Sequence, residues 1–211
     1  AVGHQAMDAN TTGTRNVAIG YRALDVNNTA NETTAVGWNA LGAQAGAGGK
    51  NVAVGDSSML ATTTGSENVG IGNAALTSNT TGGNNVAIGR SALSSNTTAS
   101  NNVAIGYHAA LAATTSTGNV VIGTDAVKTG VFTGANNVVI GKLAGEDLTS
   151  ADANVIIGED AGKNQTTADN NVIIGQGAGE ANTTGTNNVA VGQAALSTNT
   201  TGSASTAVGY Q

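Results

Sequence analysis

Few side chains in this sequence could carry out acid–base or metal chemistry. The 211 residues include two histidines, His4 and His108, and no cysteine, with 13 acidic and 7 basic residues. Serine, histidine and an acid do not recur together at any fixed spacing, so neither a nucleophilic triad nor a zinc site is indicated. We therefore expect no enzymatic activity and no cofactor.

Acidic residues are concentrated in one stretch, and the chain as a whole is negatively charged. Carboxylates bind calcium, but this stretch lacks the fixed aspartate spacing of calcium-binding β-rolls, so it predicts a solvated acidic face and no metal site. The net charge of −6, without a basic stripe, argues against a nucleic acid partner. The acidic residues of the stretch are Glu146, Asp147, Asp152, Glu159, Asp160 and Asp169.

Aromatic side chains are the one feature that could recognise a ligand. Tyr21 and Trp38 each follow a glycine of a recurring motif, at a position where other copies carry charged or amide side chains. Such variation is typical of a solvated position, and an exposed ring there could stack on a sugar or another flat ligand. Tyr21 and Trp38 are therefore candidate ligand contacts, with packing on the protein's own surface as the simpler alternative.

The recurring motif predicts the architecture. Thirteen glycines, each preceded by Val or Ile, are spaced 17 residues apart ten times and 18 residues apart twice. This repeat is too short for the paired helices of ankyrin or tetratricopeptide arrays and suits one coil of a β-solenoid. Pro is absent and aromatic residues are 2%, so we expect a thin core shared between stacked coils. The glycines are Gly3, Gly20, Gly37, Gly55, Gly72, Gly89, Gly106, Gly123, Gly141, Gly158, Gly175, Gly192 and Gly209.

We therefore predict an all-β chain, a parallel β-solenoid of about twelve 17-residue coils that forms a single repeat domain over residues 1–211. The residues three and one before the glycine are Val or Ile in most copies, and they alternate, so they share one face of a strand. We expect that face to fill the coil interior. The residue between them is small or apolar, from Ala18 to Ile156, although it should then point outward. A strand that is apolar on both faces indicates that something covers its outer side.

Two positions of the coil exchange volume: where the residue at one of them is large, the residue at the other is small. Four residues after the glycine the usual residue is large, but three consecutive coils carry Gly145, Gly162 and Gly179 there, and the same coils have Val or Ile at the outward position. Positions that conserve a shared volume are expected to touch. We expect them to line an apolar seam between identical chains, favouring a homotrimer because cyclic symmetry buries the same stripe on every chain. The seam residues are Ala18, Leu24, Ala87, Leu93, Val139, Ile156, Ile173 and Leu196.

Two alternatives to this arrangement remain open at the level of sequence. Two chains could pair about a two-fold axis in place of three chains about a three-fold axis. A single solenoid could also fold over so that both apolar stripes meet inside one coil, which would satisfy the same exchange of volume.

The recurring polar positions look architectural. Asn stands four residues before the glycine in ten of the twelve complete copies, and stacked Asn side chains can hydrogen-bond from coil to coil as a ladder. Asn-Thr-Thr runs such as 79–81 and 96–98 also spell the N-glycosylation acceptor, but their structural period favours a turn over a glycan. The insertions near 46–49 and 131–134 are expected at corners, because an insertion within a strand would flip every later side chain.

The run Asn-Asn-Val-Ala-Ile-Gly, at residues 84–89 and 101–106, resembles the Asn-Ser-Val-Ala-Ile-Gly coil motif of YadA-like trimeric autotransporter adhesin heads. The longer unit, which continues x-x-Ala-Leu-x-x-Asn-Thr-Thr-Gly, resembles repeats in the shafts of phage tail fibres and related bacterial surface fibres. The resemblance covers the whole chain and implies a left-handed parallel β-roll, assembled as a homotrimer, with a role in adhesion or host recognition. Because the adhesin head repeat is shorter than 17 residues, the fibre repeat is the closer match, and both kinds of fibre remain open.

From these features we expect a structural shaft or stalk segment of a fibre used for adhesion or host attachment, placed by the resemblance outside the cell, on its surface or on a virion. A module that binds a surface glycan or receptor along its side is the second expectation, and an ice-binding solenoid is the third. The apolar runs are too short to cross a bilayer, so we expect no membrane insertion in this segment. The chain begins and stops within a repeat, which suggests a slice of a longer fibre.

Overall fold

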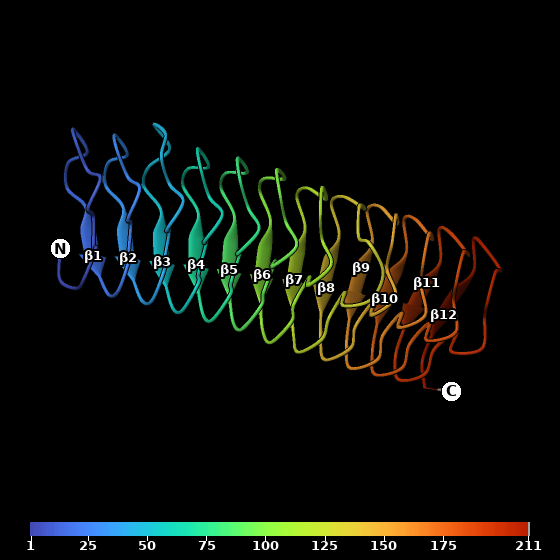
Figure 1. Cartoon of the computed structure of the whole chain (residues 1–211). Helices are drawn as coiled ribbons and strands as arrows, with labels where there is room; N and C mark the ends of the chain where they lie inside the picture. The colour runs from blue at the N-terminus through green and yellow to red at the C-terminus, as the bar shows by residue number, and fades with distance from the viewer. Residues whose placement is uncertain (211) are drawn as a thin grey trace. The chain divides into compact units, whose positions relative to one another are not determined.

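The structure, a computed structural model, describes residues 1–210 and divides into two compact units, Ala1–Asn101 and Asn102–Gln211. Each unit is an all-β parallel solenoid in which successive coils contribute one three-residue strand each, without helices among the described residues (Figure 1). The fold class expected from the repeat is therefore confirmed. The first unit contains β1 (Val17–Ile19), β2 (Thr34–Val36), β3 (Val52–Val54), β4 (Val69–Ile71) and β5 (Val86–Ile88). The second contains β6 (Val103–Ile105), β7 (Val120–Ile122), β8 (Val138–Ile140), β9 (Val155–Ile157), β10 (Val172–Ile174), β11 (Val189–Val191) and β12 (Thr206–Val208).

Neighbouring strands within each unit pair in parallel and without slippage. In the second unit, for example, Ile156 lies opposite Ile173. The single inserted residues leave this register intact because they fall outside the strands: Ala35 pairs with Ala53 across the first insertion, and β7 and β8 keep their register across the second. The expectation that neither insertion lies within a strand is therefore confirmed.

The repeat glycine is required by the way the coils stack. Gly55 has a φ of +133°, a region that residues with a Cβ rarely adopt. A Cβ on Gly55 would lie 2.6 Å from the carbonyl oxygen of Gly72 in the next coil, so no methyl group fits between the two backbones. The same approach occurs between Gly20 and Gly37, at 2.4 Å. This glycine therefore allows each coil to contact the next through its backbone alone.

The strand face that was expected to point outward points into the interior of the coil. The middle residues Ala18 and Ile173 are 0% and 1% exposed, whereas Val17 and Ile19, on either side of Ala18, are 45% and 44% exposed. The prediction that the flanking Val and Ile fill the interior is therefore wrong. The physical reason is the asparagine just before the strand: Asn171 is buried, and its Nδ2 donates to the backbone carbonyl of Gly185, 14 residues further along the chain. Because alternate residues share a face, Ile173 must then point inward as well.

The two positions that exchange volume do touch, but within one coil. A Cβ on Gly179 would lie 2.9 Å from Ile173 Cδ1, and one on Gly162 would lie 3.4 Å from Ile156 Cδ1. In coils with Ala at the centre of the strand, Leu occupies this space, as Leu93 does with 0% of its surface exposed. Both apolar stripes therefore meet inside a single chain, which is the alternative that the sequence had left open.

Buried asparagines join one coil to the next. The backbone N–H and the Nδ2 of Asn68 donate to Asn51 Oδ1 at 2.9 and 3.3 Å, and Asn68 Nδ2 also donates to Gly82 O at 2.9 Å. Asn79 Nδ2 donates to the same Gly82 carbonyl at 3.0 Å, so two asparagine rows converge on one corner. The predicted asparagine ladder is confirmed, and it satisfies backbone carbonyls that would otherwise be buried without a donor.

Replacing a repeat glycine should weaken the stack. We expect Gly55→Ala to lower the free energy of unfolding by at least about 2 kcal/mol, because it adds backbone strain to a clash with the next coil. Gly177→Ala is the matched control. The φ of Gly177 is +61°, and a Cβ there would lie 3.6 Å from the nearest atom. Ala194 adopts a similar φ at the same repeat position, so an alanine is tolerated there. Chemical denaturation measures both variants, and equal effects would contradict the role assigned to the repeat glycine.

The exchange of volume can be reproduced by mutation. Ile173→Ala should cost about 2–5 kcal/mol through the cavity it leaves, and Gly179→Leu about 1–3 kcal/mol through overpacking. The double variant copies the Ala190 and Leu196 pair of the next coil, so most of the stability should return. Urea denaturation of the four proteins gives the coupling energy, and strictly additive costs would show that the two positions do not share one space.

Candidate functional site

The outward residues of the strands form an apolar surface, which we call the outer stripe. Val17 and Ile19 are nearly half exposed, and Ile71 is 37% exposed. Single exposed apolar residues are ordinary, but here a β-branched pair recurs on strand after strand, which is typical of a surface that meets another molecule. In the first unit the stripe consists of Val17, Ile19, Thr34, Val36, Val52, Val54, Val69, Ile71, Val86 and Ile88. In the second it consists of Val103, Ile105, Val120, Ile122, Val138, Ile140, Val155, Ile157, Val172, Ile174, Val189, Val191, Thr206 and Val208.

The residues predicted to line a seam between chains lie elsewhere, in the interior of their own coils. A side chain without exposed surface cannot contact another chain in the folded state, so the seam assignment is wrong for the seven of these residues that are buried. Their strand and turn positions were paired correctly, but the contact is within one chain. Ala18, Leu24, Ala87, Leu93, Val139 and Ile156 are 0% exposed, Ile173 is 1% exposed, and Leu196 is only partly buried.

The two aromatic candidates lie side by side in successive coils, and a histidine joins them. The rings of Tyr21 and Trp38 are stacked, with centroids 6.2 Å apart and planes inclined by 12°, and His4 stacks on Tyr21 at 5.6 Å and 6°. Tyr21 is 41% and Trp38 51% exposed. Since the rings cover part of one another's faces, this row offers less open ring surface to a flat ligand than separate rings would.

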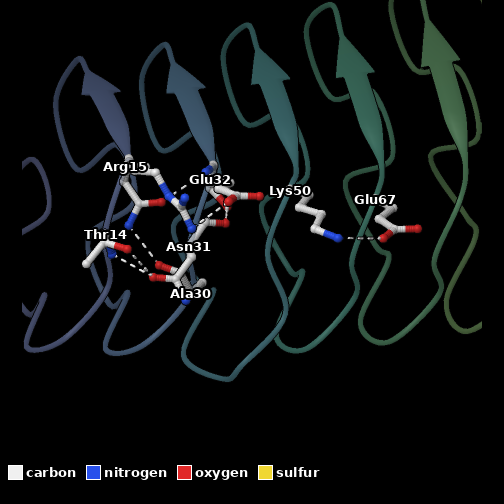
Figure 2. Close-up of polar contacts among 9 residues, drawn as sticks. Thr14, Arg15, Ala30, Asn31, Glu32, Lys50 and Glu67 are labelled. Atoms are coloured by element: carbon white, nitrogen blue, oxygen red, sulfur yellow. Dashed lines mark hydrogen bonds and ion pairs between the residues drawn. The ribbon is translucent and has the colours of Figure 1, made fainter.

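Charged side chains form a second row, on the other side of the outer stripe. Arg15, Glu32, Lys50 and Glu67 occupy the same position in four successive coils, five residues before the repeat glycine, and alternate in sign (Figure 2). Arg15 pairs with Glu32 at 2.6 Å and Lys50 with Glu67 at 3.2 Å. The Arg15 and Lys50 side chains remain 72% and 62% exposed, so these pairs add little to stability.

An open hollow of about 350 Å³ lies along this charged row. It forms where the first insertion passes, because Ala47 and Gly49 leave this part of the corner without a long side chain. Asn31 and Ser66 complete its lining together with the four charged residues. The hollow is therefore polar and carries charges of both signs.

The residues of the acidic stretch take part in contacts within and between coils. Asp152 Oδ1 accepts the backbone N–H of Ala135 at 2.6 Å, and Lys142 pairs with Glu159 at 3.1 Å. Lys163 lies 3.2 Å from Asp160, and this hydrogen bond raises the pKa of Lys163. In the same way Asp25 raises the pKa of Arg22 in the first unit. Among residues 1–210 no three His, Cys, Asp or Glu side chains are grouped to hold a metal ion.

The asparagines of the Asn-Thr-Thr runs are engaged in the corners. Asn79 and Asn96 are 0% exposed, and Asn182 is 2% exposed. Each donates its Nδ2 to the carbonyl three residues later, at 2.9–3.1 Å. Because glycan transfer modifies that nitrogen, these acceptors are inaccessible once the coil has folded.

Comparison with models of protein families, with characterised proteins and with solved structures finds no match for this chain. No helix long and apolar enough to cross a membrane occurs in the part of the chain that the structure describes. The function must therefore be argued from the surface itself.

The aromatic row can be tested through Trp38, which is the only tryptophan in the sequence. Tyr21→Ala should make Trp38 fluorescence more accessible to quenching by acrylamide, because it uncovers one face of the indole ring. Tyr107→Ala, at the same repeat position in the second unit, should leave the quenching unchanged. Identical quenching in all three proteins would show that Tyr21 and Trp38 do not stack in solution.

Proposed function

We propose that this chain is a structural shaft or stalk segment of an extracellular, cell-surface or virion fibre used for adhesion or host attachment. In this proposal three copies pack side by side through their outer stripes. The proposed location and the number of three chains follow the resemblance to trimeric adhesin heads and fibre shafts. A catalytic role is not part of the proposal.

The outer stripe is the observation that carries this proposal. Interior residues such as Ile156 already fill the hydrophobic core of the coil within one chain, so the stripe is not needed to complete the core of a single solenoid. Its Val and Ile side chains nevertheless recur on most strands in the two units. Burying such residues yields about 25 cal/mol for each Å² removed from water, which favours packing against an identical stripe. Cyclic symmetry would cover the stripe of every copy in the same way.

The regular contacts between coils support a spacing role. Successive coils repeat the same strand pairing and glycine contact, and most of them carry the asparagine of the ladder, so copies of the repeat extend the solenoid without changing its cross-section within a unit. The surface side chains vary from coil to coil, apart from the outer stripe. Such a surface suits a stalk better than a site that must be present in every coil.

The stacked pair Tyr21 and Trp38 favours a second, local role. Both rings are exposed, and exposed tyrosine and tryptophan side chains commonly bind sugars or protein surfaces. A surface glycan or receptor could contact the segment at these coils. Because the two rings partly cover each other, we rank this role below the stalk.

Analytical ultracentrifugation of the segment tests the proposal. We expect the mass of three chains for the unmodified protein. Ile71→Asp should raise the concentration at which the assembly dissociates by at least about tenfold, because the substitution places a charge in the part of the outer stripe that assembly would bury. Thr98→Asp adds the same charge at an exposed corner outside the stripe and should leave assembly unchanged. A single-chain mass for the unmodified protein, or equal behaviour of both variants, would overturn the proposal.

A further inference from the structure

Two exposed rows border the outer stripe in the first unit. The leading rim lies five residues before the repeat glycine and the trailing rim lies one residue after it. The leading rim consists of Arg15, Glu32, Lys50 and Glu67 in successive coils, followed by Asn84. The trailing rim consists, in the same five coils, of Tyr21, Trp38, Asp56, Asn73 and Arg90.

Symmetry determines which rims meet when copies assemble. If copies are related by rotation about an axis parallel to the direction in which the coils stack, the leading rim of one copy faces the trailing rim of its neighbour. This holds for two copies as well as for three. An antiparallel pair would instead bring each rim against its own equivalent.

We infer that copies of this chain dock in parallel and with their coils in register, the leading rim of one copy against the trailing rim of the next. The inference rests on the proposed assembly through the outer stripe and adds the contacts that set its alignment. In this arrangement Lys50 faces Asp56 of the neighbouring copy, and both side chains are exposed in the single chain. In the proposed assembly of three copies the pair is formed once at each interface.

The alternation of charge disfavours other alignments. A shift by one coil in one direction places Glu32 against Asp56 and Glu67 against Arg90, so that a repulsive pair offsets an attractive one, and a shift in the other direction places Glu67 against Asp56. Like charges that meet at an interface are unfavourable. In register, none of the five coils brings two like charges together, since Glu67 faces Asn73 and Arg90 faces Asn84. Rim charges therefore select the alignment that cyclic closure also requires.

Shape and ring chemistry agree with the same alignment. In register Arg15 faces Tyr21, and a guanidinium over an aromatic ring is attractive even where Arg15 keeps its pairing with Glu32. The bulkiest residue of the trailing rim, Trp38, faces the coil of Glu32, where the open hollow follows the leading rim. A neighbouring copy therefore presents its largest rim side chain where the leading rim has room.

A charge-swap series tests this inference at low ionic strength. We expect Lys50→Asp and Asp56→Lys, each alone, to raise the dissociation concentration at least about tenfold, and the double variant to return to within about threefold of the unmodified protein. Lys142→Asp is the matched control: it also removes an ion pair with the glutamate of the next coil, at 3.1 Å, but in register it faces Asn136. Its effect should stay below about threefold.

The possible outcomes separate the inference from the proposal on which it rests. Suppose that the unmodified protein assembles but the dissociation concentration of the double variant is as high as that of the single variant that assembles least tightly. The rim pairing is then wrong, and assembly through the stripe still stands. If Lys142→Asp weakens assembly as much as Lys50→Asp does, the effect comes from the pairs within each chain, and the inference also fails. If the unmodified protein is a single chain at every concentration, the proposed assembly itself is wrong.

Discussion

The contact between repeat glycines in successive coils is the constraint on which the rest of the structure depends. Backbone atoms of Gly20 and Gly37 approach so closely that a Cβ would lie 2.4 Å from the next carbonyl oxygen, which holds the coils in a uniform stack. Once coils are stacked in this way, each repeat position becomes a row. Asparagines, rings and charges that are 17 residues apart in sequence are then neighbours, as the contacts of Asn51 with Asn68 and of Tyr21 with Trp38 show.

The sequence was sufficient to predict the rows but not the face on which each row lies. Glycine spacing predicted the parallel solenoid and its register, and the exchange between Gly179 and Ile173 predicted a real contact. The strand is only three residues long and apolar on both faces, so hydrophobicity alone could not decide which face points inward. The deciding signal was polar: Asn four residues before the glycine needs a buried partner, and its parity places the middle residue inside. Hydrogen-bonding requirements were thus more informative here than side-chain size.

This reversal changes what the apolar surface means. Had the middle residues formed the outer surface, a seam between chains would have been made largely of alanine, with a few larger residues. The structure instead presents Val and Ile on most strands, which is a wider and more uniform apolar surface. In the first unit it is bordered by exposed rows whose side chains vary from coil to coil, and in the proposed assembly those rows control how copies align without altering the coil interior. In the proposed assembly, stability within a chain and recognition between chains therefore use different residues.

The most direct test of this account is the accessibility of the outer stripe as the protein assembles. The sequence contains no cysteine, so a single thiol introduced by Ile88→Cys on the stripe, or by Thr98→Cys at an exposed corner, can be labelled without background. We predict that labelling at position 88 slows as the protein concentration is raised, while labelling at position 98 stays constant. A labelling rate at position 88 that stays constant over the whole concentration range would contradict the claim that the outer stripe packs against another copy.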